Sequence, residues 1–227
     1  MPRLVWHAAN TKKYENGVRN VVLYVKNGTN GAYANGVAWN GVTAISEKPT
    51  GADTSAVYAD DEKYLNIISN EDFTASIEAL CYPDEFAECD GTKEIVSGFT
   101  ATQQKRVPFA LCYRTNVGDE TDEEKGFKLH IIYGCLASPT EKGYTTMNDN
   151  KEPMNFSWEI TTTPVEIGTG FRPTAHVEID STKYTETAAK ARLDSLIDAL
   201  YGSDSPSAQP TLKMPGEIKT ILQASGS

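Results

Sequence analysis

The residues best suited to chemistry in this sequence are its three histidines and four cysteines, the side-chain types that bind zinc most often. They are scattered along the chain, at His7, His130, His176, Cys81, Cys89, Cys112 and Cys135. No two cysteines have the C-x-x-C spacing of a zinc or redox motif. A zinc site would have to be assembled from segments that are far apart in sequence. We therefore predict neither a metal site nor a cofactor site.

Local enzyme motifs are also absent from the sequence. There is no phosphate-binding G-x-x-x-x-G-K-[ST], no nucleophile elbow G-x-S-x-G and no H-E-x-x-H. Gly168-Thr169-Gly170 is followed by Phe171-Arg172, which breaks a dinucleotide-binding fingerprint before its third glycine. We predict that the protein is not an enzyme and has no catalytic residues.

Two acidic groups could bind a hard cation or shape a surface field. The first lies in residues 83–91, where oxygen ligands could bind calcium, but the spacing does not match an EF-hand loop. A short helix with Pro83 in its first turn, and with acidic residues favoured by the helix dipole, is the preferred interpretation. The second group lies between two strong strand patterns and is expected to be a solvated hairpin loop or a negative surface. Its members are Asp119, Glu120, Asp122, Glu123 and Glu124.

Exposed aromatic side chains could form a platform for stacking sugars. Trp158 alternates with Phe156 and Ile160, which places it in the core of the fold rather than on such a platform. Trp6 and Trp39 are less constrained by their neighbours in sequence and stay candidates for a glycan-binding surface.

The elements that must position these residues are mainly strands. Asn-Gly pairs recur through the first fifty residues and favour the tight turns of β-hairpins. Apolar side chains alternate with period two in residues 106–115, 127–135 and 155–165, and shorter strand candidates are 18–25, 37–46, 64–68, 73–80 and 175–180. In 127–135 the predicted apolar face runs from Phe127 to Cys135. The sequence predicts a mainly β fold, an antiparallel β-sandwich or barrel with extended loops.

One flanking C-terminal helix is predicted over residues 185–201, with Thr185 as its N-cap and Gly202 at its C-terminal end. Its apolar stripe is Ala189, Leu193, Leu196, Ile197 and Leu200. Packing on an open side of the sheets is a commoner use of such a stripe than a membrane or a partner groove. The domain is therefore expected to span residues 1–202. Residues 203–227 are expected to be a linker followed by either a disordered tail or an arm that docks on another subunit.

Composition sets the physical class of the protein. The 227 residues carry 31 acidic and 21 basic side chains, a formal net charge of −10, and 39% are apolar. These values are typical of a soluble globular protein, and no apolar run is long enough for a membrane span or a signal peptide. The negative net charge argues against a protein that binds nucleic acid through its phosphates. We expect a protein made in a cytoplasm without a membrane partner.

Several segments together resemble the major tail tube proteins of long-tailed bacteriophages that infect Gram-positive hosts. The segments are KYLN at 63–66, YPDEFAECDG at 82–91, KLHIIYG at 128–134, ASPTEKGY at 137–144 and FSWEITTTPV at 156–165. The resemblance runs from about residue 5 to residue 202, and the combination is more specific than any one segment.

The resemblance implies a structural protein of the virion tail, made in the bacterial host cytoplasm. Six copies would close into a ring, and rings would stack into a tube through which the genome passes. The implied partners are further copies of the chain, other tail proteins such as tape measure, tail terminator and baseplate, and double-stranded DNA as cargo that is not adsorbed.

In this family a long loop contacts the neighbouring ring, and residues 47–61 correspond to it. Together with the N-terminal segment 2–15 and the C-terminal arm, they provide the candidates for contacts between rings. These are Trp6, Pro49, Asp53, Val57, Tyr58, Asp60, Leu212, Met214 and Ile218. The acidic residues 119–124 listed above are the candidates for the lumen.

Two alternatives stay open at this point. The inner tube of a contractile injection machine, such as a phage-like bacteriocin or a type VI secretion system, would share the fold. A glycan-binding β-sandwich that uses Trp6 and Trp39 belongs to a different functional class.

Overall fold

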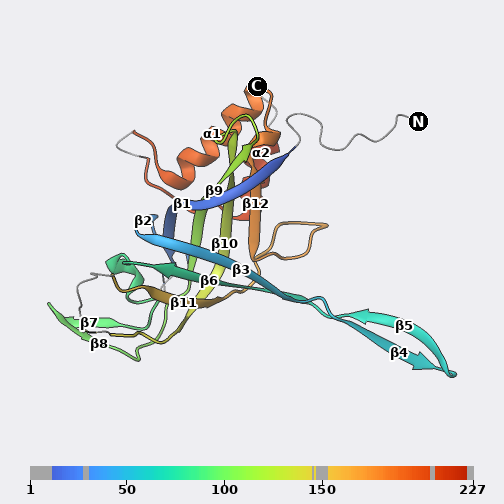
Figure 1. Cartoon of the computed structure of the whole chain (residues 1–227), viewed down its shortest axis with the longest axis horizontal. Helices are drawn as coiled ribbons and strands as arrows, with labels where there is room; N and C mark the ends of the chain where they lie inside the picture. The colour runs from blue at the N-terminus through green and yellow to red at the C-terminus, as the bar shows by residue number, and fades with distance from the viewer. Residues whose placement is uncertain (1–11, 28–30, 145, 147–152, 205–207, 224–227) are drawn as a thin grey trace.

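The computed structural model describes residues 12–27, 31–144, 146, 153–204 and 208–223, and Figure 1 shows their arrangement. The strands are β1 (Lys13–Val25), β2 (Val37–Trp39), β3 (Val42–Gly51), β4 (Thr54–Ala59), β5 (Glu62–Ile68), β6 (Glu71–Ala79), β7 (Lys93–Val96), β8 (Phe99–Ala101), β9 (Phe109–Asp119), β10 (Gly126–Pro139), β11 (Phe156–Thr161) and β12 (His176–Asp180). The helices are α1 (Thr187–Tyr201) and α2 (Pro215–Gln223), with short 3-10 turns at Asp84–Phe86 and Ser181–Lys183.

One large antiparallel sheet forms the body of the protein. Its strand order is β2-β1-β9-β10-β11-β6-β3, with β12 also paired to β10, and two-stranded sheets are formed by β4-β5 and by β7-β8. No closed barrel is found in the part of the chain that the structure describes, because this path ends at β2 and at β3. The prediction of a mainly β, antiparallel fold is confirmed, whereas the barrel is not observed.

Strand β10 connects the two halves of this sheet. Residues 128–132 pair with β12, and residues 136–139 pair with β11. Between these two stretches, Gly134 has a positive φ of 59°, and a Cβ atom there would lie 2.4 Å from the carbonyl oxygen of Thr163. Only glycine fits this backbone without strain. The register of β10 against β9 shifts here, as in a β-bulge.

The bulge at Gly134 corrects the predicted apolar face of residues 127–135. Leu129, Ile131 and Tyr133 lie in one core, but Cys135 lies in the other. The extra residue of a bulge reverses the side-chain alternation, which strict period-two reasoning does not anticipate.

The first core lies between the two halves of the sheet, where β3, β6 and β11 cross over β1, β9 and β10 (Figure 1). Trp158 is at its centre and contacts the rings of Trp39 and Phe86 with centroid separations of 5.7 and 5.0 Å. The second core lies between the opposite face of β9, β10 and β12 and the two helices. The sheet thus has apolar side chains on both faces.

Helix α1 contributes Leu193, Leu196 and Leu200 to the second core, which confirms the predicted helix and its apolar stripe. The predicted cap is wrong, because Glu186 occupies the N-cap position and makes no side-chain capping bond. Gly202 follows the helix with a φ of +83°, the conformation that glycine adopts without a steric cost.

The C-terminal segment is neither a disordered tail nor an arm for another subunit over residues 215–223, which corrects the sequence-based prediction. Residues 215–223 form helix α2, and its Ile218 is buried in the second core of the same chain. Leu212 and Met214 pack against that core as well. A nine-residue helix has little stability in isolation, so this docking is what holds it. The fold therefore has two C-terminal helices, and the domain extends beyond residue 202.

A membrane-crossing helix, long and apolar enough for a bilayer, is not found among the described residues.

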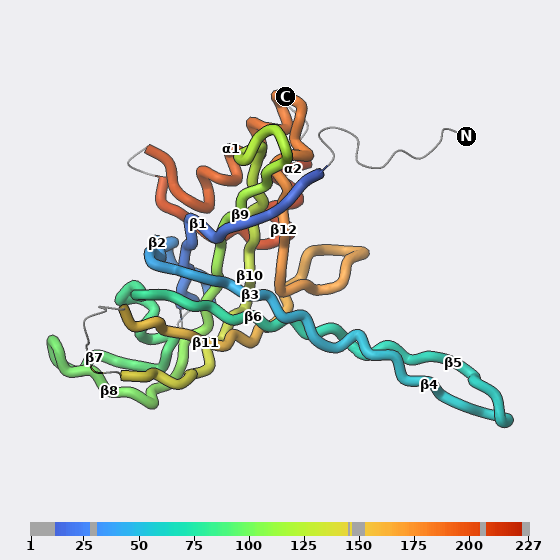
Figure 2. Tube along the Cα trace, in the orientation of Figure 1, coloured from blue at the N-terminus to red at the C-terminus, as the bar shows by residue number. Residues whose placement is uncertain are grey.

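Residues 47–61 are a second correction, because they form strands rather than a long loop. Strands β3 and β6 continue past the body, and β4 and β5 extend them into a two-stranded ribbon, here called the projecting ribbon (residues 54–68). Figure 2 shows the ribbon leading away from the rest of the molecule. Asp60 and Asp61 have φ values of 54° and 62° and form its two-residue turn, as the turns of tight hairpins require.

Candidate functional site

The projecting ribbon has several exposed large apolar side chains. Its exposed large apolar side chains are Val57, Tyr58, Tyr64, Leu65, Ile67 and Ile68. Successive side chains of a strand point to opposite faces, so Ile68 lies on one face of β5, and Leu65 and Ile67 lie on the other. Tyr64 lies at a register shift between β4 and β5. Both faces of the ribbon therefore present apolar surface to solvent, the kind of surface that proteins use for association.

The residues proposed for contacts between rings fall into three groups. All of the candidates from the 47–61 segment are exposed: Pro49 on β3, Asp53 between β3 and β4, and Val57, Tyr58 and Asp60 on the ribbon. Leu212, Met214 and Ile218 pack against their own chain, and Ile218 is only 3% exposed, so its side chain is not available to a neighbour. Trp6 lies outside the described residues.

A second hairpin with exposed apolar residues was not singled out from the sequence. Strands β7 and β8 pair with each other, and Ile95, Val96 and Phe99 are each at least 60% exposed. The turn at Gly98, where φ is +79°, is the local signal that could have predicted it. The described chain thus has two apolar hairpins outside its cores.

The acidic residues 119–124 form the connection between β9 and β10, as predicted for a hairpin loop. Asp119 is 2% exposed and organises the turn, since its carboxylate accepts hydrogen bonds from the backbone N–H groups of Thr121 and Asp122. The ion pair with Lys125 holds the pKa of Asp119 well below its usual value. Glu120, Asp122, Glu123 and Glu124 are exposed. Glu120 pairs with Lys12 at 3.0 Å and Glu124 with Arg19 at 3.7 Å, so part of the negative charge of the loop is compensated.

The acidic segment 83–91 forms the predicted helical turn, as a short 3-10 helix over Asp84–Phe86 that follows Pro83. Asp90 follows this turn and is buried, with its carboxylate bonded to a core side chain. Its carboxylate accepts a hydrogen bond from the indole N–H of Trp158 at 2.9 Å and pairs with Lys142 at 3.0 Å. A buried carboxylate requires such partners, and both of its oxygens have one.

The tryptophans do not form an exposed platform in the described chain. Trp158 is fully buried, as predicted, and Trp39 is 3% exposed with its indole N–H bonded to the carbonyl oxygen of Cys81 at 2.9 Å. Trp39 is therefore a core residue, which removes it from the glycan-binding hypothesis.

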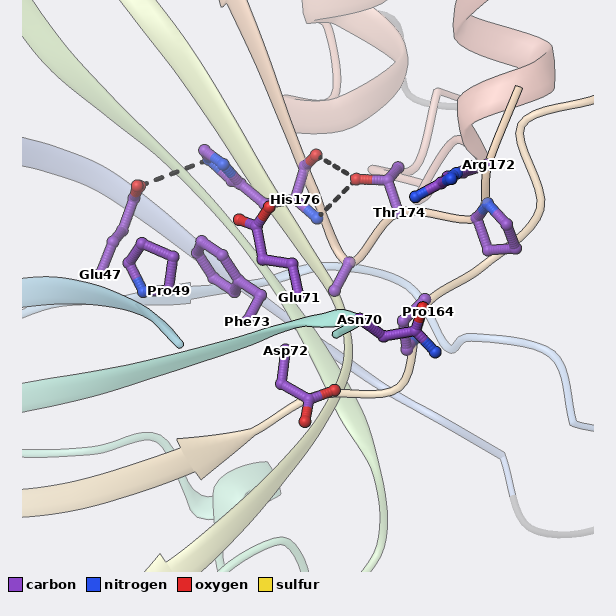
Figure 3. A pocket seen from close by; sticks show the side chains of 12 residues that line it. Glu47, Pro49, Asn70, Glu71, Asp72, Phe73, Pro164, Arg172, Thr174 and His176 are labelled. Carbon is purple, nitrogen blue, oxygen red and sulfur yellow. Dashed lines mark hydrogen bonds and ion pairs between the residues drawn. The ribbon is translucent and has the colours of Figure 1, made fainter. Parts of the chain in front are cut away.

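Three side chains that are distant in sequence meet where β3 leaves the body. Glu47 comes from β3, His130 from β10 and His176 from β12. Figure 3 shows Glu47 and His176 pointing toward each other at an open pocket of about 800 Å³, which Glu71 and Arg172 also border. The sequence pattern did not predict this cluster. His130 and His176 are 46 residues apart, and Glu47 precedes His130 by 83 residues.

The ionisation of this cluster leaves a carboxylate beside a neutral imidazole. A hydrogen bond with His130 lowers the pKa of Glu47 to about 2, against the opposing effect of burial. Burial lowers the pKa of His176, and this effect outweighs the nearby Glu47 carboxylate. At neutral pH, Glu47 is ionised and His176 is uncharged.

A comparison with known protein families found no family model that matches this chain, and a comparison with curated proteins found no match either.

Proposed function

We propose that this chain is a structural protein of a bacteriophage tail, in which six copies form a ring and stacked rings form the tail tube that conducts the genome. The observation that carries the proposal is the projecting ribbon with apolar residues on both faces. The sequence resemblance supplies the identity of the assembly. In this interpretation the sheet that folds over on itself at β10 is the β-sandwich of a tail tube protein.

The ribbon supports self-association for physical reasons. An isolated two-stranded ribbon is marginally stable in water, and this one leaves large apolar side chains such as Tyr64 and Ile67 uncovered. Because both faces are apolar, covering the ribbon requires surface on each side of it, as a position between neighbouring copies would provide. A ribbon of one copy that docks on the body of the next makes a heterologous contact, which closes into rings or continues as a filament.

The charge of the chain fits a conduit for DNA. Six chains at −10 each would carry a formal charge of −60 per ring. A lumen with part of that charge repels the phosphates of duplex DNA, so the genome slides rather than adsorbs. The exposed Glu120, Asp122, Glu123 and Glu124 of the β9–β10 loop are the lumen candidates. Asp119 belongs to the same loop, but its carboxylate is directed into the turn.

Electron microscopy and sedimentation of a matched pair of variants test the proposal. Tyr64→Asp places a charge on the ribbon, and Tyr144→Asp places the same charge on a tyrosine of similar exposure outside it, 72% against 79%. We expect the unsubstituted protein and Tyr144→Asp to form rings or tubes under assembling conditions, and Tyr64→Asp to stay monomeric with an unchanged circular dichroism spectrum.

Two results would overturn the proposal. Unsubstituted protein that never forms rings or tubes, even with the assembly factors of its own virus, would refute the tail tube function. Equal assembly of Tyr64→Asp and Tyr144→Asp would refute the role of the ribbon.

A further inference from the structure

The strand register places Glu47, His130 and His176 on the inner side of the folded sheet. Leu129 and Ile131 point to the second core, so His130 between them points the other way. His176 is the Cα partner of Ile132, which belongs to the first core, and therefore shares that side. On β3, Glu47 lies two residues beyond Ile45, which packs against the same core.

Parallel rings hold the two imidazoles in place. Tyr113 stacks on His130 with a centroid distance of 4.8 Å and an interplanar angle of 4°. His130 stacks on His176 at 5.4 Å and 10°, and His176 stacks on Phe73 at 4.9 Å and 14°. These ring contacts restrict the rotation of both imidazoles before any ligand binds.

The three potential ligand atoms form a nearly equilateral triangle. His130 Nδ1 lies 3.3 Å from His176 Nε2, and each nitrogen lies 3.3 Å from Glu47 Oε1. Zinc bonds of about 2.0–2.2 Å in a tetrahedron separate neighbouring ligand atoms by about 3.3–3.5 Å. The regular octahedron that other divalent metals adopt would bring neighbouring ligands to about 3.0 Å at similar bond lengths. The observed spacing matches the tetrahedron.

The hydrogen bonds around the cluster orient the His130 ring. Thr115 donates its hydroxyl hydrogen to Glu15, so His130 Nε2, 3.1 Å from Thr115 Oγ1 and 3.3 Å from Glu15 Oε1, is the donor there. A metal-binding histidine typically donates its other ring N–H to a carboxylate in this way. Glu47 Oε1 accepts hydrogen bonds from the Tyr113 hydroxyl and from His130 Nδ1. Zinc would therefore displace the proton between His130 Nδ1 and Glu47.

The fourth direction is open to solvent. Glu47 and His176 border the pocket of Figure 3. The His130 side chain is only 6% exposed and is not among the residues that line the pocket. Three protein ligands with one accessible position are a known zinc arrangement, in which water is the fourth ligand.

From this geometry we infer that Glu47 Oε1, His130 Nδ1 and His176 Nε2 bind a zinc ion, with a water molecule as the fourth ligand. The ion would connect β3 to β10 and β12, strands of the two halves of the folded sheet. Because β3 continues into the projecting ribbon, zinc would brace the base from which the ribbon extends. The inference stands independently of the tail tube function, since it concerns the single chain.

Isothermal titration of chelator-treated protein with zinc tests the inference. We expect one ion per chain and a melting temperature that rises with zinc concentration. His176→Ala and Glu47→Gln should each weaken zinc binding by more than about 100-fold, because loss of second-shell partners alone costs about 10–100-fold. Cobalt should replace zinc and give the intense visible absorption of a tetrahedral site.

Two control variants separate this site from adventitious binding. Glu71→Gln removes a carboxylate that borders the same pocket, and His7→Ala removes the remaining histidine of the sequence. Both should bind zinc as the unsubstituted protein does. The inference is overturned if no zinc binds, if His176→Ala and Glu47→Gln bind it unchanged, or if His7→Ala abolishes binding.

Discussion

The body of the protein and the projecting ribbon both contain apolar strand residues, which are buried in the body and exposed in the ribbon. In the body, apolar strand residues such as Leu111 and Ile160 are at most 1% exposed, because helices or the other half of the sheet cover them. In the ribbon, Ile67 and Ile68 are more than half exposed, although they also lie on an antiparallel strand. The body thus covers these apolar strand residues within the single chain, whereas the ribbon leaves apolar surface exposed to solvent. Substitutions in the two regions should therefore affect different properties.

The largest loss of stability is expected in the first core. Trp158→Ala removes the ring that Trp39, Tyr82 and Phe86 contact, and leaves Asp90 without its indole donor. The free energy of unfolding should fall by about 3–5 kcal/mol in urea titration. A loss below about 1 kcal/mol would mean that the body does not depend on this core.

A second large loss of stability is expected in helix α2, which packs against the second core of the same chain. Ile218→Ala should cost about 2–4 kcal/mol, while Thr220→Ala on the exposed side of the helix should change stability by less than about 0.5 kcal/mol. Urea unfolding of the monomer measures both changes in stability. If both substitutions change the free energy of unfolding by an equally negligible amount, α2 does not depend on its own chain and would instead be an arm for another subunit.

A smaller, pH-dependent effect is expected at the β9–β10 turn. Since the native pKa of Asp119 lies below the ordinary value of 3.8, its contribution to stability is full above that value and is lost as the pH falls toward the native pKa. Asp119→Asn should therefore reduce stability at neutral pH and flatten its decline in acid. Unfolding titrations between pH 7 and pH 2 measure this slope. The exposed Glu123→Gln of the same loop is the control and should alter the slope less; an equal change in both variants would contradict the role of Asp119.

The smallest effect on stability, together with the largest effect on assembly, is expected in the ribbon. Tyr58→Ala removes a side chain that is 69% exposed, so the free energy of unfolding of the monomer should change by less than about 0.5 kcal/mol. Sedimentation should nevertheless show weaker ring or tube formation. A stability loss comparable with that of Trp158→Ala would mean that the ribbon is part of the folded core.

Much of the body follows from local sequence pattern. The alternation around Phe109, Leu111 and Tyr113 predicted β9 and its buried face, and the stripe of Leu193, Leu196 and Leu200 predicted α1. These patterns succeed because each element buries one side against a continuous core. The reversal at Gly134 was missed, since a bulge depends on where two different partner strands meet β10.

Half of the ribbon and the whole histidine cluster were missed, for different reasons. Residues 64–68 were predicted as a strand and lie in β5, whereas β4 was not predicted. Pro49, Gly51 and the two aspartates at 60–61 disfavour strands, and a ribbon exposed on both faces has no core to impose alternation. The cluster arises only when three strands from distant parts of the chain are brought together, so no spacing motif marks it. Helix α2 was missed because tertiary contacts, rather than its nine residues, stabilise it.

We propose that the ribbon of one copy is covered by its neighbours in the assembled tube. Cryo-electron microscopy of assembled tubes tests this claim most directly, because it locates residues 54–68 relative to adjacent copies. We expect both faces of the ribbon, with Ile68 on one and Ile67 on the other, to be buried against neighbouring chains. Tubes in which the ribbon extends freely into solvent would contradict it.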